Sequence, residues 1–172
     1  MEIVLIVVCF ICIAFCIWFL PSLFPNRKHR LNRKIAQITL NKIRQANSVP
    51  EIYYCLRSTD PFVFEEMILL ALKHAGHQVK HNKRYTGDGG IDGRCKINGK
   101  KYLIQAKRYR SYVNPNHIDD FDKLCSSNNS RGLFVHTGKT GKKALTKHYA
   151  SLSILSGRKM LDLLIKGKLN SC

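Results

Sequence analysis

Three polar residues stand at positions where a single β-hairpin brings them together. Asp92 precedes the dipeptide Asn98-Gly99, and Gln105 and Lys107 follow it. Asn-Gly is a strong signal for a two-residue type I′ turn, because that turn needs a positive φ at both central residues. Counting outward from such a turn places Asp92 directly opposite Gln105, and Lys107, two residues further on, points to the same face. A carboxylate, an amide oxygen and an ammonium group are therefore predicted to converge.

This grouping suits the hydrolysis of a phosphodiester. Asp92 supplies a hard oxygen ligand for Mg²⁺, Gln105 supplies a second oxygen, and Lys107 can orient the attacking water or stabilise developing charge. The opposite face of the second strand is apolar, with Tyr102, Ile104 and Ala106. The alternative is a solvent-facing hairpin in which Asp92 and Lys107 form an ordinary surface ion pair. Spacing alone leaves both interpretations open.

The elements that must position these residues follow from capping and periodicity signals. Asp60-Pro61 begins a helix and Gly76 ends it. Further helices are predicted at 115–125, 142–150 and 158–166, and strands at 77–80, 91–97, 100–108, 133–136 and 151–155. A helix, an antiparallel hairpin and then strand–helix–strand units predict an α/β fold, with a mixed β-sheet flanked by helices.

The motifs around the hairpin resemble those of a known family. They are Phe64-Glu65, the glycine-rich run 87–93 (GDGGIDG), the run 104–109 (IQAKRY) and the run 132–138 (GLFVHTG). Their order and spacing resemble the Mrr-type restriction endonucleases of the PD-(D/E)xK nuclease superfamily, with Gln in place of the more usual acidic residue before x-Lys. The resemblance covers residues 60–167 and implies a restriction-endonuclease-like fold.

The resemblance also implies roles for individual residues. Asp92 corresponds to a metal ligand, Gln105 to the acidic ligand's position, the Ala106 carbonyl to a further ligand and Lys107 to the catalytic lysine. Glu65 corresponds to the family's helix glutamate, as a catalytic residue and metal ligand. The implied cofactor is Mg²⁺, or Mn²⁺.

Two points within this assignment stay open. Glu65 is also explained as an exposed acid in the first turn of its helix, and the adjacent Glu66 could be mistaken for it. Gln105 removes one negative charge from the metal site, which weakens metal affinity unless a DNA phosphate completes the coordination. The fold is therefore better supported by the sequence than the activity.

The charge of the chain predicts a polyanionic partner. The 172 residues include 29 Lys and Arg against 11 Asp and Glu, a formal net charge of +18. Such a balance favours a nucleic acid or an anionic membrane surface. Near the predicted site, the basic residues expected to contact DNA are Arg84, Arg108 and Arg110.

Other classes of site are disfavoured. Seven cysteines form no regular spacing, so neither a disulfide scaffold nor a four-cysteine zinc site is expected. Three histidines, His74, His77 and His81, straddle a helix end and lack partner cysteines. Gly138-Lys139-Thr140 lacks the upstream glycine of a phosphate-binding loop, so no nucleotide is expected as a ligand.

A membrane anchor is predicted before the domain. Residues 3–20 are apolar without interruption, and at about 1.5 Å per residue such a helix approaches the roughly 30 Å thickness of a bilayer core. No Lys or Arg precedes the run, and several follow it: Arg27, Lys28, Arg30, Arg33 and Lys34. The positive-inside rule then places the N-terminus outside and the remaining chain in the cytoplasm.

The predicted organisation is a transmembrane anchor at 1–25, a basic helical neck at 26–59, an endonuclease domain at 60–167 and a tail at 168–172. The neck is expected to hold the domain away from the bilayer. The first functional hypothesis is a Mg²⁺-dependent DNA endonuclease tethered to the bacterial inner membrane, in defence or in processing transferred DNA. A homodimer is compatible, because cutting both strands usually suggests two active sites. The alternatives are a non-catalytic module that tethers DNA to the membrane and a structural component whose basic face meets anionic lipid.

Overall fold

The computed structural model describes residues 27–82, 89–147, 149 and 151–169. The predicted anchor at 3–20 lies outside the described residues. Among those that are described, no helix has the length and apolar character needed to cross a membrane. The chain divides into two compact units, Met1–Leu31 and Asn32–Cys172. The second unit contains the predicted site.

Two helices precede the predicted domain: α2 (Arg27–Arg44) and α3 (Val49–Ser58). Ser48 begins α3, because its hydroxyl accepts a hydrogen bond from the backbone N–H of Glu51. Both helices bury apolar residues in the core that also holds the domain's sheet, namely Ala36, Leu40, Ile43, Ile52 and Leu56. The part of the expected neck that follows Asn32 is therefore a packed layer of the second unit.

Helix α2 buries one stripe of its surface. Ile35 and Ile38 lie outside this stripe and are 39% and 68% exposed. The buried stripe instead follows Ala36, Leu40 and Ile43, at intervals of four and three residues, as a helix packed on a core requires.

Helix α4 (Pro61–His74) begins and ends where its capping residues predict. The Asp60 side chain accepts hydrogen bonds from the N–H groups of Phe62 and Val63, and Gly76 follows the helix with a φ of +86°. The helix is buried along most of its length, so it forms the centre of one helical layer.

A single five-stranded sheet has the order β1-β2-β3-β4-β5. Its strands are β1 (Gln78–His81), β2 (Gly93–Ile97), β3 (Lys100–Lys107), β4 (Arg131–His136) and β5 (Leu152–Leu155). The first three strands are antiparallel neighbours, whereas β3, β4 and β5 are parallel. The mixed sheet predicted from the sequence is therefore present.

The hairpin between β2 and β3 has the predicted turn. Asn98 and Gly99 have φ values of +50° and +77°, and Ile97 pairs with Lys100. This register continues along the strands and fixes which residues of β2 stand opposite those of β3.

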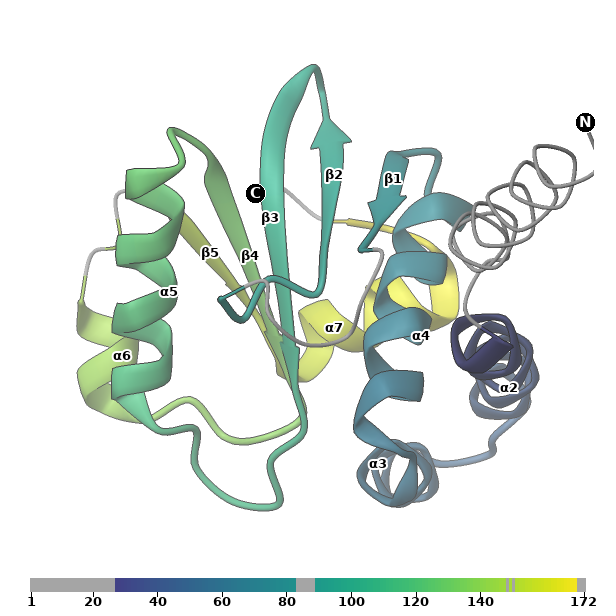
Figure 1. Ribbon diagram of the computed structural model, residues 1–172. Coiled ribbons are helices and arrows are strands. Elements are labelled where there is room, and N and C mark those ends of the chain that lie inside the picture. The colour runs from purple at the N-terminus through teal and green to yellow at the C-terminus, as the bar shows by residue number, and fades with distance from the viewer. Residues whose placement is uncertain (1–26, 83–88, 148, 150, 170–172) are drawn as a thin grey trace, which may run out of the picture. The chain divides into compact units, whose positions relative to one another are not determined.

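Helices cover the sheet from both sides (Figure 1). α4 and α7 (Gly157–Lys166) pack against one face, and their core includes Ile104 of β3. α5 (Pro115–Ser127) and α6 (Lys142–Thr146) pack against the other, where Leu103 and Phe134 are buried. α5 and α6 also connect parallel strands, so the C-terminal end of β3 leads toward the start of α5.

Candidate active site

Asp92 lies at the point where the β2–β3 ladder ends. The last paired residues are Gly93 and Ile104. The Asp92 N–H donates to the Ile104 carbonyl at 2.8 Å, and the Asp92 Oδ2 accepts from the Ala106 N–H at 2.6 Å. The carboxylate thus accepts the hydrogen bond from the N–H of β3 that a backbone carbonyl would accept if the ladder continued. The N–H and carbonyl of a strand residue point to the same edge, so the Ala106 carbonyl lies on this edge as well.

Gln105 contacts the glycine-rich loop and not the carboxylate of Asp92 predicted to face it. Its Nε2 donates to the Gly90 carbonyl at 2.7 Å, and the residue is 8% exposed. Its Oε1 is buried without a hydrogen-bond partner. A buried carbonyl oxygen that no donor satisfies needs an explanation, and a role as a cation ligand is one that suits the neighbouring carboxylates.

The loop conformation that holds Gln105 depends on Gly90. Gly90 has a φ of +89°, and a Cβ atom there would lie 2.7 Å from the Gln105 Nε2. A side chain at this position would therefore be strained and would displace the amide.

Glu65 reaches the same end of β3 from α4. It lines a groove of about 280 Å³ together with Ala106 and Lys107. Burial raises the pKa of Glu65 to about 8, the carboxylate of Asp92 adds to the rise, and Lys107 opposes it. Burial also raises the pKa of Asp92 to about 6, against the opposing effects of the Ala106 hydrogen bond and Lys107. The raised pKa values show that one lysine does not provide enough positive charge to stabilise both carboxylates, so the site would favour binding a cation.

The neighbouring Glu66 has a different environment. It is 2% exposed, with its Oε2 at 3.4 Å from the Arg33 Nε and at 2.8 Å from the His81 Nδ1. Glu66 therefore links α4 to α2 and β1. Glu65 is the glutamate whose pKa is shifted by the charges of Asp92 and Lys107.

Lys107 is the last residue of β3 and lines two grooves. It lines the groove that contains Glu65 and also a second groove of about 270 Å³ that contains Gln105 and Asp120. By the alternation along β3, Lys107 shares a face with Gln105, as the sequence predicted. The lysine is partly exposed, so a substrate can reach it.

The oxygen donors available here are two carboxylates, one amide and one backbone carbonyl. Within the described part of the chain, no group of three or more His, Cys, Asp or Glu side chains could hold a metal ion. A metal at this end of β3 would therefore rely on Gln105 Oε1 and the Ala106 carbonyl as well as on Asp92 and Glu65. Hard oxygen donors of this kind fit Mg²⁺, which binds proteins through one or two carboxylates.

The three arginines predicted to contact DNA have separate environments. Arg84 lies outside the described residues. Arg108 donates from Nη1 to the Arg57 carbonyl at 2.8 Å, and this bond joins the end of β3 to α3. Arg110 is exposed beyond the strand. Arg108 also lines the groove that contains Glu65 and Lys107, and Arg110 does not line it.

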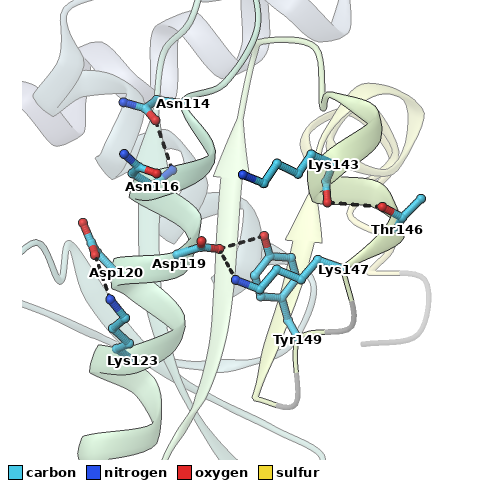
Figure 2. A network of polar contacts seen from close by, with 9 residues as sticks. All are labelled: Asn114, Asn116, Asp119, Asp120, Lys123, Lys143, Thr146, Lys147 and Tyr149. Carbon is cyan, nitrogen blue, oxygen red and sulfur yellow. Dashed lines mark hydrogen bonds and ion pairs between the residues drawn. The ribbon is translucent and has the colours of Figure 1, made fainter.

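His117 is a site residue that the sequence analysis missed. It lines both grooves, and its Nδ1 is 2.5 Å from the hydroxyl of Tyr109. His117 lies in the first turn of α5, which Asn114 caps by accepting from the Asn116 N–H (Figure 2). The start of this crossover helix follows the end of β3, so topology was the signal that could have identified it.

Comparison with known proteins gives one match. The family model Mrr_cat, described as a restriction endonuclease, matches residues 56–164. The match includes Glu65, Asp92, Gln105 and Lys107. No curated protein and no solved structure matches the chain.

Proposed function

The chain belongs to the Mrr_cat restriction endonuclease family, and from this membership we propose that it is a metal-dependent DNA endonuclease with its active site at the C-terminal end of β3. A restriction endonuclease domain implies nuclease activity, a hydrolase reaction and DNA as the substrate. The metal requirement, the roles of single residues and the placement at a membrane are the further parts of the proposal.

The convergence of Glu65, Asp92 and Lys107 beside the buried Oε1 of Gln105 carries the proposal. An ordinary surface ion pair, the alternative considered for the hairpin, would leave the carboxylate of Asp92 with a low pKa. The pKa of Asp92 is instead raised to about 6 by burial, despite Lys107 nearby. A site that keeps two carboxyl groups this poorly solvated is suited to binding a cation.

Asp92, Glu65, Gln105 and the Ala106 carbonyl are the proposed ligands of a Mg²⁺ or Mn²⁺ ion. When bound, the ion supplies Lewis acidity and lowers the pKa of a coordinated water. The carboxylate of Asp92 is held in place by the Ala106 N–H, so it does not need to reorganise when it binds.

Lys107 is the proposed catalytic lysine. In the reaction, the oxygen of a water molecule forms a bond to phosphorus and the bond from phosphorus to the leaving sugar oxygen breaks. One water proton leaves the attacking oxygen, and the departing oxygen gains one. The ammonium of Lys107 stabilises the charge that develops on the phosphate oxygens or holds the water in line.

Gln105 favours a second candidate, a nuclease-fold module that binds DNA without cutting it. An amide in the place of an acid removes one negative charge, and its N–H is already committed to the Gly90 carbonyl. This candidate keeps the fold and the basic surface but has weak metal affinity.

The proposal also places the protein at a membrane. Residues 3–20 would form a single-pass anchor in the bacterial inner membrane, with the N-terminus outside and the nuclease domain in the cytoplasm. There the enzyme would meet DNA that enters or leaves the cell, in restriction or in processing transferred DNA. A homodimer would supply two active sites for a duplex.

The test is cleavage of plasmid DNA by the purified full chain with Mg²⁺ or Mn²⁺. We expect Asp92→Ala and Lys107→Ala each to lower the rate by about 10²-fold or more. Lys159→Ala removes an exposed cation from α7 and is the matched control. Equal rates in all four proteins would overturn the proposed site, and DNA binding by the wild type without cleavage would favour the second candidate.

A further inference from the structure

A set of exposed cations covers one face of the antiparallel strands. Because side chains alternate along a strand, Lys80 of β1, Arg94 and Lys96 of β2 and Lys101 of β3 share the face opposite to α4. All four are exposed, whereas the intervening Cys95 is buried in the core beneath α4. These four residues are called the basic sheet face below.

The cations of the basic sheet face stand directly opposite one another. Lys80 pairs with Arg94 across β1 and β2, and Lys96 pairs with Lys101 across β2 and β3. Like charges in directly opposed positions destabilise a sheet. Arg94 also donates to the side chain of Asn82 at 3.0 Å, which leaves its charge uncompensated. Two such pairs on adjoining strands disfavour folding, and an anionic ligand would offset this repulsion.

The face is hollowed into two adjoining grooves. The first, of about 540 Å³, is lined by all four cations together with Asn128 and Ser130. The second, of about 520 Å³, adds Lys100 and Arg131 and shares Lys101 and Ser130 with the first. No acidic residue of the described chain lines either groove.

The ligand that best fits this surface is the phosphate backbone of a nucleic acid. A bilayer surface is broad, and proteins that bind it usually insert exposed aromatic or aliphatic side chains beside their cations. On the described part of β1, β2 and β3 no large hydrophobic residue is exposed. Exposed cations that line grooves beside amide and hydroxyl groups instead suit individual phosphates.

We propose that the basic sheet face binds the DNA backbone at a distance from the scissile phosphate, as a second contact surface of the same enzyme. This inference rests on the proposed function for the identity of the ligand. Lys101 and Lys107 lie on the same face of β3, six residues apart, so about 20 Å separates them. At about 3.4 Å per nucleotide along one strand, this corresponds to roughly six phosphates from the cut.

The experiment measures binding of the full chain to a long DNA duplex by fluorescence anisotropy over a range of salt concentrations, without a metal that supports cleavage. Each phosphate contact contributes about 0.9 to the slope of log K against log salt. Lys96→Gln/Lys101→Gln is therefore expected to lower the magnitude of that slope by about 2, and the affinity roughly tenfold at low salt. The same variant is expected to melt at a higher temperature, because it removes an opposed pair of like charges.

Lys73→Gln/Lys159→Gln is the matched control. It removes two exposed lysines from α4 and α7, which cover the opposite face of the sheet. We expect this control to keep the wild-type slope. Equal slopes for both double variants would overturn the inference. A Lys96/Lys101 variant that binds DNA normally but loses binding to phosphatidylserine vesicles would also overturn it, and would assign the face to lipid.

Cleavage and the salt dependence of binding test the nuclease activity and the second DNA surface independently. If the wild type does not cut DNA but its binding depends on Lys96 and Lys101, the nuclease proposal fails and the second surface stands. If DNA is cut and the slope is unchanged by Lys96→Gln/Lys101→Gln, the nuclease proposal stands and the second surface is refuted.

Discussion

Asp119, beside the parallel strands, differs from Asp92 and Glu65, at the end of the β2–β3 hairpin, in whether its carboxylate has found cationic partners. In the parallel half, Asp119 of α5 accepts from the Lys147 ammonium at 2.8 Å and from the Tyr149 hydroxyl at 3.1 Å (Figure 2). These partners lower the pKa of Asp119, with the Lys147 hydrogen bond as the largest cause. In the antiparallel half and beside it, the pKa values of Asp92 and Glu65 are raised, and Gln105 has an unpartnered oxygen.

This difference separates polar groups that stabilise the fold from those available to a ligand. A carboxylate that is already paired with a cation stabilises the fold and is less available to bind a ligand. A carboxylate held in a poorly solvated place, without enough positive charge, costs stability and binds a cation more readily. The following substitutions test that division in both halves.

The largest effect is expected from Gly90→Ala, which acts on the antiparallel half through Gln105. A Cβ at Gly90 would lie 2.7 Å from the Gln105 Nε2, so the amide must move. Displacement of a site group by about 1 Å can cost about 10² in rate. Cleavage assays should show a loss of that order.

Gly89→Ala is the control for this change. Gly89 also has a positive φ, +64°, but a Cβ there meets no atom within 4 Å. Both substitutions carry the same kind of backbone strain, and only Gly90→Ala disturbs Gln105. Equal losses of cleavage in the two variants would show that the orientation of Gln105 does not matter.

The two neighbouring glutamates of α4 should separate activity from stability. Glu65→Gln is expected to lower cleavage about tenfold or more, because it removes a proposed metal ligand, while the metal-free protein becomes more stable. Glu66→Gln is expected to lower the free energy of unfolding by about 1–3 kcal/mol, because a buried acceptor of Arg33 and His81 is lost. Urea unfolding and cleavage rates measured on both variants test the split, and a reversed pattern would place Glu66 in the active site.

The raised pKa values predict how stability changes with pH. Folded Asp92 and Glu65 bind protons more tightly than the unfolded chain, since their pKa values rise from 3.8 to about 6 and from 4.5 to about 8. The metal-free protein should therefore lose stability as pH rises from about 4 to about 8. Urea midpoints measured across this range should fall in the wild type, and Asp92→Asn/Glu65→Gln should flatten the curve.

Metal should reverse that trend, because Mg²⁺ competes with protons for the two carboxyl groups. Cleavage should increase with pH through the same window, and its midpoint should move to lower pH as the Mg²⁺ concentration increases. A midpoint that does not respond to Mg²⁺ would contradict the assignment of Asp92 and Glu65 as metal ligands.

The parts of this molecule that could be predicted from sequence depend on local information. The Asn98-Gly99 turn has the positive φ values that its residues favour, and the register of β2 and β3 follows from it. The capping of α4 by Asp60 likewise depends on residues within one turn. Such features need no knowledge of the rest of the chain.

The parts that could not be predicted depend on contacts between distant segments. The family resemblance favoured Glu65 over Glu66 as the site residue, but local sequence could not give the contacts of Glu66 with Arg33 and His81, which come from other elements. The contact of Gln105 with Gly90 depends on how the chain enters β2, where Asp92 leaves the ladder and bonds to Ala106. Strand pairing gave the correct face for Lys107 but could not give these side-chain directions.

The smallest effect is expected from Asp119→Asn, in the parallel half. Lys147 and Tyr149 hold the pKa of Asp119 below its ordinary value, so the charged form stabilises the fold above the unfolded pKa and this contribution is lost as pH falls. The variant should be slightly less stable than the wild type near neutral pH and should match it in acid, while cleavage and its dependence on Mg²⁺ stay unchanged. Thermal unfolding at both pH values, beside a cleavage assay, tests this. An exposed ion pair contributes little to stability, so only a small change in unfolding is expected. A large loss of cleavage from Asp119→Asn would mean that Asp119 takes part in function and does not only stabilise the fold.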